Sequence, residues 1–233
     1  MKTALYLIPV LLITVVFLIR AELLKLRNQI FLLKPTATLL VIAVAALSFF
    51  EPNYNPTCSI GVLIGLLLSL GGDIALLFQD NKEAFTIGLG LFLAAHIAYM
   101  VVFILLGQHS SWDLVSGAIL LSAGFALFRL FAPNLGSMKV PVIAYIVIIS
   151  LMVNQALATF SSPVFSNAQA WMIAGGALLF YISDVILAAN RFWRPWKYQR
   201  ISLAFYYSGQ VLIALAASFF IAFARIPTSL LVG

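Results

Sequence analysis

Charged residues, cysteine and histidine are all scarce in this sequence. Only 9% of its 233 residues are charged, whereas 64% are apolar. A soluble domain has about 25% charged and about 45–50% apolar residues, so the scarcity of charge excludes a soluble globular fold and favours a polytopic membrane protein. The single cysteine, Cys58, excludes an internal disulfide and a thiolate metal cluster.

Several familiar motifs are also missing. No Gly-x-Ser-x-Gly turn occurs, which argues against serine-hydrolase chemistry, and no glycine-rich phosphate loop or nucleotide motif is found. The net charge of +6 would suggest nucleic acid as a partner of a soluble protein. Here the basic residues lie between apolar runs, where membrane orientation and anionic headgroups explain them better. We therefore expect no nucleic-acid partner and no cofactor.

What the sequence has instead is a series of long apolar runs. A helix needs about 20 mainly apolar residues to cross a bilayer. No connection between the runs is long enough for a soluble domain, and the first run lacks a signal-peptide cleavage site. The sequence therefore predicts a single all-α transmembrane domain over residues 1–233, a bundle of eight helices. The expected spans are residues 4–19, 35–50, 59–79, 85–106, 113–132, 140–160, 168–190 and 200–224.

Lysine and arginine are distributed unevenly between the two sides of this predicted bundle. The connections after the first, third, fifth and seventh spans hold eleven of the 13 basic residues, and only Lys2 and Arg225 fall on the other side. Cytoplasmic loops carry an excess of Lys and Arg. The sequence thus predicts an integral membrane protein with both termini outside and the basic connections in the cytoplasm.

Two of the seven acidic residues, Asp73 and Asp184, lie deep inside apolar runs. An ionisable group at membrane depth costs roughly 2.5–3.5 kcal/mol and is a functional hypothesis by default. With the predicted span ends, both carboxylates lie roughly 9 Å inside the cytoplasmic boundary at 1.5 Å per residue. Polar residues of neighbouring spans reach a similar zone, namely Lys34, His96, Tyr99, Tyr206, Tyr207 and Gln210.

The two halves of the chain have matching spacings. His96 follows Asp73 by 23 residues, as Tyr207 follows Asp184. A four-plus-four parallel repeat would place the two aspartates at equivalent positions. The identities are few, so the sequence gives only a weak prediction of such a repeat.

Structural interpretations compete with functional ones at each of these positions. A buried aspartate or histidine can simply hold helices together by hydrogen bonds, and Lys34 can extend to the headgroups. Asp73, Asp184 and His96 could also be three ligands of a catalytic zinc ion. Because no second histidine lies at this depth, we expect no metal.

The order and spacing of several short motifs resemble the YhhN/TMEM86 lysoplasmalogenase family over nearly the whole chain. The matching segments are Lys34 with Pro35, residues 69–77 (SLGGDIALL), 92–99 (FLAAHIAY), 175–184 (GGALLFYISD) and 206–210 (YYSGQ). The resemblance implies a hydrolase that cleaves lysoplasmalogens, the 1-alkenyl lysophospholipids, to a fatty aldehyde and glycerophosphoethanolamine or glycerophosphocholine. The implied partners are a lysophospholipid substrate and membrane lipids. The implied location is the inner (cytoplasmic) membrane of a bacterium, with the site in the cytoplasmic half.

A buried pair of carboxylates suits this chemistry. A vinyl ether is activated by protonation of its outer alkene carbon, and water captures the resulting oxocarbenium ion. One protonated and one ionised carboxylate can supply the acid, the stabilising anion and the base, as in glycosidases. We therefore predict Asp73 and Asp184 as the acid/base pair, without choosing which is protonated, and expect His96 and Tyr207 to orient a carboxylate or the water.

The same hypothesis assigns the remaining polar residues to substrate binding. Lys34, with Asn190 or Arg191, would hold the phosphate headgroup, and Tyr99, Tyr206 and Gln210 would line the site. The main alternative function is a proton-coupled transporter or lipid carrier that uses the same aspartates as a relay. A metal-dependent lipid amidase or esterase is the second.

Overall fold

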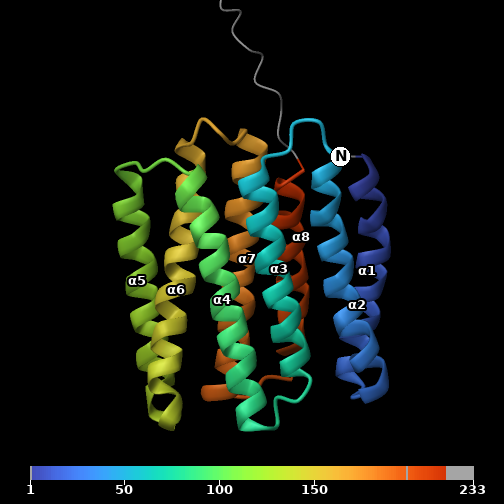
Figure 1. Ribbon diagram of the computed structural model, residues 1–233. Coiled ribbons are helices and arrows are strands. Elements are labelled where there is room, and N and C mark those ends of the chain that lie inside the picture. The colour runs from blue at the N-terminus through green and yellow to red at the C-terminus, as the bar shows by residue number, and fades with distance from the viewer. Residues whose placement is uncertain (1, 198, 219–233) are drawn as a thin grey trace, which may run out of the picture.

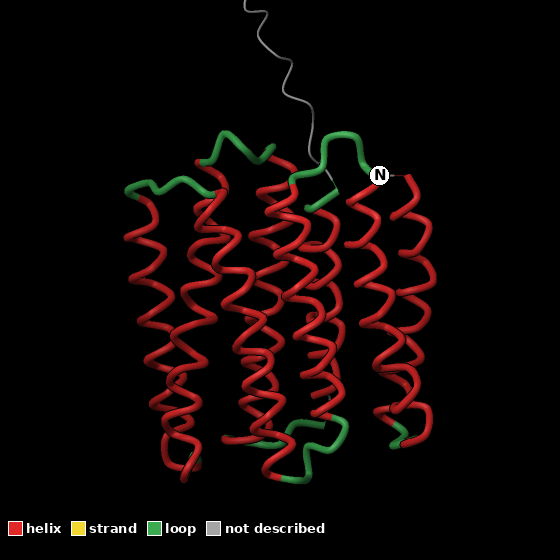
Figure 2. The backbone as a smooth tube through the Cα atoms, in the orientation of Figure 1, coloured by secondary structure: helices red, strands yellow, loops and turns green. Residues whose placement is uncertain are grey.

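The computed structural model describes residues 2–197 and 199–218, and they form an all-α bundle without strands (Figures 1 and 2). Its helices are α1 (Lys2–Leu23), α2 (Arg27–Ala46), α3 (Pro56–Leu76), α4 (Lys82–Leu106), α5 (Trp112–Phe131), α6 (Lys139–Ala158), α7 (Asn167–Phe192) and α8 (Ser202–Ala216). The helices run side by side and are joined by short connections. The predicted fold class is confirmed.

Seven of the eight helices are long and apolar enough to span a membrane. The described part of α8 has 15 residues, and the predicted eighth span continues into residues 219–224, which lie outside the described residues. One predicted start was wrong: α2 begins at Arg27, so Lys34 lies two turns inside the helix. Residues 28–33 continue the helical pattern, and Pro35 is accommodated within it.

Asparagine and serine side chains define where several helices begin. Asn55 accepts a hydrogen bond from the Cys58 amide with Pro56 in the first turn, and Asn81 accepts from the amides of Glu83 and Ala84. Ser166 and Gln169 form a reciprocal capping box at the start of α7. These side chains satisfy amide groups that have no partner within the helix. The turn residues that separate the apolar runs therefore also fix the helix ends.

Glycine allows the backbones of α7 and α8 to touch. A Cβ atom on Gly176 would lie 2.8 Å from the Gly209 carbonyl oxygen, and one on Gly209 would lie 2.6 Å from that of Gly176. Small residues at such crossings are typical of helix packing in membranes, where close approach replaces the hydrophobic driving force. The contact holds α8 against α7 and so positions the tyrosines of α8.

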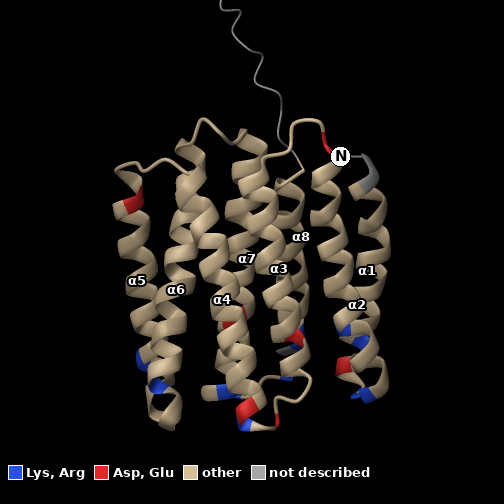
Figure 3. Ribbon diagram, in the orientation of Figure 1, with Lys and Arg blue, Asp and Glu red and all other residues tan. Residues whose placement is uncertain are grey.

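The outside of the bundle is apolar and one of its ends is basic. On α5 only Gly124 and Phe131 are buried, while Leu114, Ile119 and Phe125 are more than 60% exposed. Lys and Arg gather at the end where α1–α2, α3–α4, α5–α6 and α7–α8 connect (Figure 3), which we call the basic end. Apolar helices of spanning length with apolar outer faces make this an integral membrane protein.

Candidate active site

Asp73 lies in the last turn of α3, where α3 meets α2 and α8. Thr38 on α2 and Tyr206 on α8 each donate a hydrogen bond of 2.6 Å to its Oδ2 atom. The Lys34 ammonium nitrogen is 3.3 Å from Oδ1. The aspartate is only 2% exposed, so its charge is compensated by protein groups rather than by water.

A second layer of hydrogen bonds supports this cluster. Tyr207 donates to the Lys34 carbonyl oxygen at 3.0 Å and lies 3.3 Å from the Thr38 hydroxyl. Gln210 donates to the Tyr206 hydroxyl and accepts from Tyr99. Every one of these groups has a partner, which fixes the orientation of the donors around the carboxylate. The structure thus collects five predicted residues around Asp73: Lys34, Tyr99, Tyr206, Tyr207 and Gln210.

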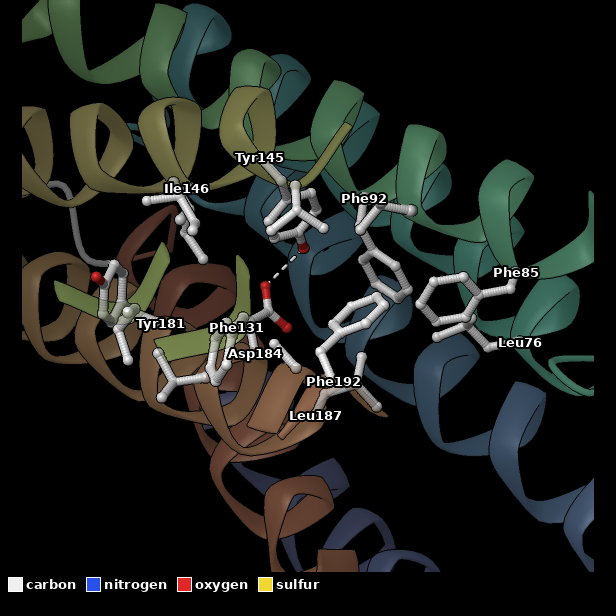
Figure 4. A pocket seen from close by; sticks show the side chains of 16 residues that line it. Leu76, Phe85, Phe92, Phe131, Tyr145, Ile146, Tyr181, Asp184, Leu187 and Phe192 are labelled. Carbon is white, nitrogen blue, oxygen red and sulfur yellow. Dashed lines mark hydrogen bonds between the residues drawn. The ribbon is translucent and has the colours of Figure 1, made fainter. Parts of the chain in front are cut away.

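Asp184 lies further from the end of its helix, on α7, and has different partners. Tyr145 on α6 donates a hydrogen bond of 2.6 Å to its Oδ2 atom (Figure 4). The Nε2 atom of His96, on α4, is 3.8 Å from the same oxygen, beyond hydrogen-bond reach. The His96 ring is fully buried and packs edge-on against Tyr145 and Phe180. Neither of its nitrogen atoms has a hydrogen-bond partner among the described residues.

Asp184 also faces a pocket whose other walls are nearly all apolar, which we call the apolar pocket. Side chains from α3 to α7 line it, and Phe92, Phe131, Ile146 and Phe192 surround the carboxylate in Figure 4. Its volume is about 60 Å³. Its apolar lining suits hydrocarbon rather than a polar headgroup.

An aromatic cluster separates the surroundings of the two aspartates. The Tyr206 ring, beside Asp73, contacts Phe92 and Phe180 with centroid distances of 5.9 and 5.2 Å. Phe180 in turn contacts His96, beside Asp184, at 4.6 Å. The predicted carboxylate pair therefore consists of two sites that share a wall, each with its own hydrogen-bond donors.

Asn190 and Arg191 lie apart from the Asp73 cluster. The Asn190 amide donates to the Ile186 carbonyl oxygen, and its Oδ1 accepts from the Trp196 amide, so it closes the end of α7. The Arg191 guanidinium packs over the Phe85 ring, which lines the apolar pocket. Their predicted headgroup contacts stay a prediction.

The hypothesis of a zinc site lacks a set of ligands. Within the described ranges, no three His, Cys, Asp or Glu side chains are close enough together to hold a metal ion. His96 lies near Asp184, whereas Asp73 is surrounded by Lys34, Thr38 and Tyr206. A cation at Asp73 would have to compete with the lysine ammonium group.

Comparison with known families identifies the family of this chain. The model of the YhhN family matches residues 29–217, which include both aspartates and all of their partners. The chain belongs to the YhhN family.

Curated relatives of this YhhN-family chain are named lysoplasmalogenases. It is 32% identical to bovine lysoplasmalogenase TMEM86A over 161 residues, which are 67% of this chain and 64% of the relative. It is 36% identical to pig lysoplasmalogenase TMEM86B over 155 residues, 66% of this chain and 61% of the relative. A lysoplasmalogenase of Mycobacterium tuberculosis is 33% identical over 134 residues, 54% and 48% of the two chains. The chain spans less than two thirds of the length of these relatives, and no solved structure matches it.

Two residues of this candidate site, Thr38 and Tyr145, were missed by sequence reasoning. Thr38 follows Lys34 by four positions, which places both on one helix face. Tyr145 is one of the few polar residues of α6. Both were detectable as polar side chains within apolar spans, but only the packing of α2 and α6 shows that they bind the aspartates.

Proposed function

We propose that this protein hydrolyses the vinyl-ether bond of lysoplasmalogens. Membership of the YhhN family and the names of the curated relatives support this activity. The observation that carries the proposal is structural: Asp73 and Asp184 share an aromatic wall, Asp73 among polar donors and Asp184 facing an apolar pocket. A single-chain lipid needs a polar and an apolar compartment of this kind.

The reaction divides into three steps. A carboxylic acid protonates the outer alkene carbon, which gives an oxocarbenium ion on the carbon next to the ether oxygen. Water adds to that carbon and loses a proton to a carboxylate. The hemiacetal then breaks its bond to the glycerol oxygen, which releases a fatty aldehyde and a glycerophosphodiester, with one water consumed.

We assign the two carboxylates different roles in this sequence. Asp184 faces the apolar pocket, where the alkenyl chain would lie, so it delivers the proton to the outer carbon. Tyr145 fixes its orientation, and His96 is placed to exchange a proton with it after a small rotation. Asp73 is paired with Lys34 and acts as the anion that stabilises the cation and orients water.

We also propose that the basic end faces the cytoplasm and both termini lie outside, in the inner membrane of a bacterial cell. The uneven distribution of Lys and Arg supports this orientation. A cysteine introduced at Ser137, in the α5–α6 connection, should react with an impermeant reagent only from the cytoplasmic side in a Cys58→Ser background. Labelling from the outside would reverse the orientation.

The activity is tested with purified protein and three matched lysolipids. We expect aldehyde release from the alkenyl compound, and no cleavage of the alkyl or acyl compounds of equal chain length, because only the vinyl ether gives an oxocarbenium ion on protonation. Cleavage of the acyl compound would indicate an esterase. An alkenyl lysolipid that stays intact, yet crosses proteoliposomes in response to a proton gradient, would support the transporter alternative.

A further inference from the structure

A second pocket opens at the basic end and is lined largely by charged side chains, so we call it the basic pocket. It has a volume of about 500 Å³, within the range of small-ligand sites. It lies among α1, α2, the end of α3 and the connection between α7 and α8. Its basic residues are Lys25, Arg27, Lys34, Lys197 and Arg200, and its acidic residues are Glu22 and Asp80.

The basic pocket adjoins the Asp73 cluster directly. Lys34 lines the pocket, and its ammonium nitrogen is 3.3 Å from Asp73 Oδ1. Leu76 lines both the basic pocket and the apolar pocket. A ligand in the basic pocket would therefore contact Lys34, the ion-pair partner of Asp73, and would be separated from the apolar pocket by Leu76.

One of the basic residues is held in an unfavourable backbone conformation. Lys25 follows the end of α1 with φ 55°, in the left-handed region that favours glycine. The Leu26 amide donates a hydrogen bond to the Ala21 carbonyl oxygen, and the Lys25 amide donates one to the Glu22 carbonyl oxygen. This pair of hydrogen bonds makes the end of α1 a Schellman motif. A lysine is strained in this conformation relative to glycine. The motif turns the chain at Lys25, which lines the basic pocket.

The two acidic residues give the pocket a mixed charge. Glu22 Oε2 is 3.2 Å from Arg200 Nε, which fixes the guanidinium in the pocket wall. Lys and Arg bind phosphate oxygen atoms, and a carboxylate can accept hydrogen bonds from an ammonium group. This combination matches a phosphodiester that carries an amine better than a doubly negative phosphate.

We propose that the basic pocket binds the phosphoethanolamine-type headgroup of the lysophospholipid. This inference rests on the proposed function and names the headgroup site for it. This headgroup site differs from the one predicted from the sequence at Asn190 or Arg191. Asn190 closes the end of α7, and Arg191 packs against the wall of the apolar pocket.

The order of groups along the substrate then matches the order of groups along the protein. Three glycerol carbons separate the phosphate from the vinyl-ether oxygen. With the phosphate in the basic pocket, the glycerol would extend past Lys34, on the side of Asp73, and the chain would continue past Leu76 into the apolar pocket that Asp184 faces.

The decisive variant is Lys25→Gly, because it removes one charge and relieves the backbone strain at the same position. Arg27→Gln removes a second charge, and Arg129→Gln, on α5 away from the pocket, is the matched control for net charge. Binding is measured by calorimetry on the full-length protein in detergent. The probes are glycerophosphoethanolamine, a non-cleavable alkyl lysophosphoethanolamine and inorganic phosphate.

We expect Lys25→Gly to weaken binding of both phosphoethanolamine probes about tenfold, the loss of one charge-assisted hydrogen bond. Its melting temperature should equal or exceed that of the unmodified protein, and Arg129→Gln should bind normally. In turnover assays KM should rise with little change in kcat. Unchanged binding in both Lys25→Gly and Arg27→Gln would overturn the proposal. Equal affinity for inorganic phosphate and glycerophosphoethanolamine would do so too, by indicating a free-phosphate site.

Because the alkyl probe cannot be cleaved, binding and hydrolysis fail independently. Loss of binding in Lys25→Gly without any aldehyde release from alkenyl substrate would retain the headgroup site and reject the hydrolase. Aldehyde release by the unmodified protein, together with unaltered probe binding in Lys25→Gly, would retain the hydrolase and reject the headgroup site.

Discussion

The surroundings of Asp73 and Asp184 differ in ways that matter for chemistry. Asp73 receives two hydroxyl hydrogen bonds, pairs with a lysine and adjoins a charged pocket. Asp184 receives one hydroxyl hydrogen bond and faces an apolar pocket, with a fully buried histidine 3.8 Å away. Two acids that look equivalent in the sequence thus have different surroundings, and the proposed mechanism uses one as a fixed anion and the other as a proton donor.

Each aspartate is contacted by one helix from its own half of the chain and by one helix from the other half. Asp73 is held by α2 and α8, and Asp184 contacts α6 and α4. A shift of four helices relates α2 to α6 and α4 to α8. Each carboxylate therefore takes one partner from its own half and one from the other. This arrangement is compatible with the four-plus-four repeat, which stays a prediction.

The largest expected effect comes from neutralising either carboxylate. Asp184→Asn and Asp73→Asn should each lower kcat by about 10²–10⁴-fold, because general acid–base catalysis contributes that much. The measurement is the initial rate of aldehyde release at saturating alkenyl lysolipid, with thermal unfolding to confirm that each variant is folded.

The two variants should also differ in stability, which sharpens the comparison. Asp73→Asn leaves the Lys34 ammonium group buried without its partner, so it should unfold at a lower temperature than Asp184→Asn. Near-normal turnover in both variants would remove the acid/base assignment. Equal losses of stability would mean that the ion pair contributes little.

A smaller effect is expected from removing single hydroxyl donors. Tyr145→Phe removes the one hydroxyl donor that Asp184 has among the described residues, whereas Tyr206→Phe leaves Asp73 with Thr38 and Lys34. A hydrogen bond to a charged group contributes about 1.5–3 kcal/mol, so Tyr145→Phe should lower kcat roughly ten- to hundredfold. Tyr206→Phe should lower it less than tenfold, by the same steady-state assay.

Thr38→Val is the matched control for this comparison because it removes a donor from Asp73 and keeps the shape of the side chain. It should reduce kcat no more than Tyr206→Phe does. The double variant Thr38→Val/Tyr206→Phe removes both hydroxyl donors that Asp73 has among the described residues. Its loss of transition-state stabilisation, calculated from kcat, should therefore exceed the sum of the losses in the two single variants. If Tyr206→Phe proved more harmful than Tyr145→Phe, the two carboxylates would have to exchange roles.

Most of the fold was predictable because the signals for it are local. A run of about 20 apolar residues has to be a helix in a bilayer, and turn residues such as Asn81 and Ser166 define where helices begin. The start of α2 was misplaced because residues 28–33 are only partly apolar, and a search for apolar runs begins too late there.

The candidate site was predictable as a set of residue types but not as a set of contacts. One network of hydrogen bonds and an ion pair surrounds Asp73, as the sequence suggested. Its other members are Lys34, Tyr206, Tyr207 and Gln210. The sequence did not separate this network from the surroundings of Asp184. That separation arises from Phe92 and Phe180, which look like ordinary apolar residues in an apolar span.

The sequence by itself determined that this protein spans a membrane as a bundle of helices and keeps two acids at depth. Hydrophobic length and the cost of burying charge act on each segment alone. Only the tertiary structure decided that Thr38 and Tyr206 hold one acid while Tyr145 holds the other. In a bilayer, lipid and protein interior are equally apolar, so periodicity does not reveal which face of a helix packs inward. The rotation of each helix, and with it the partner of each carboxylate, is set by the close contacts between helices.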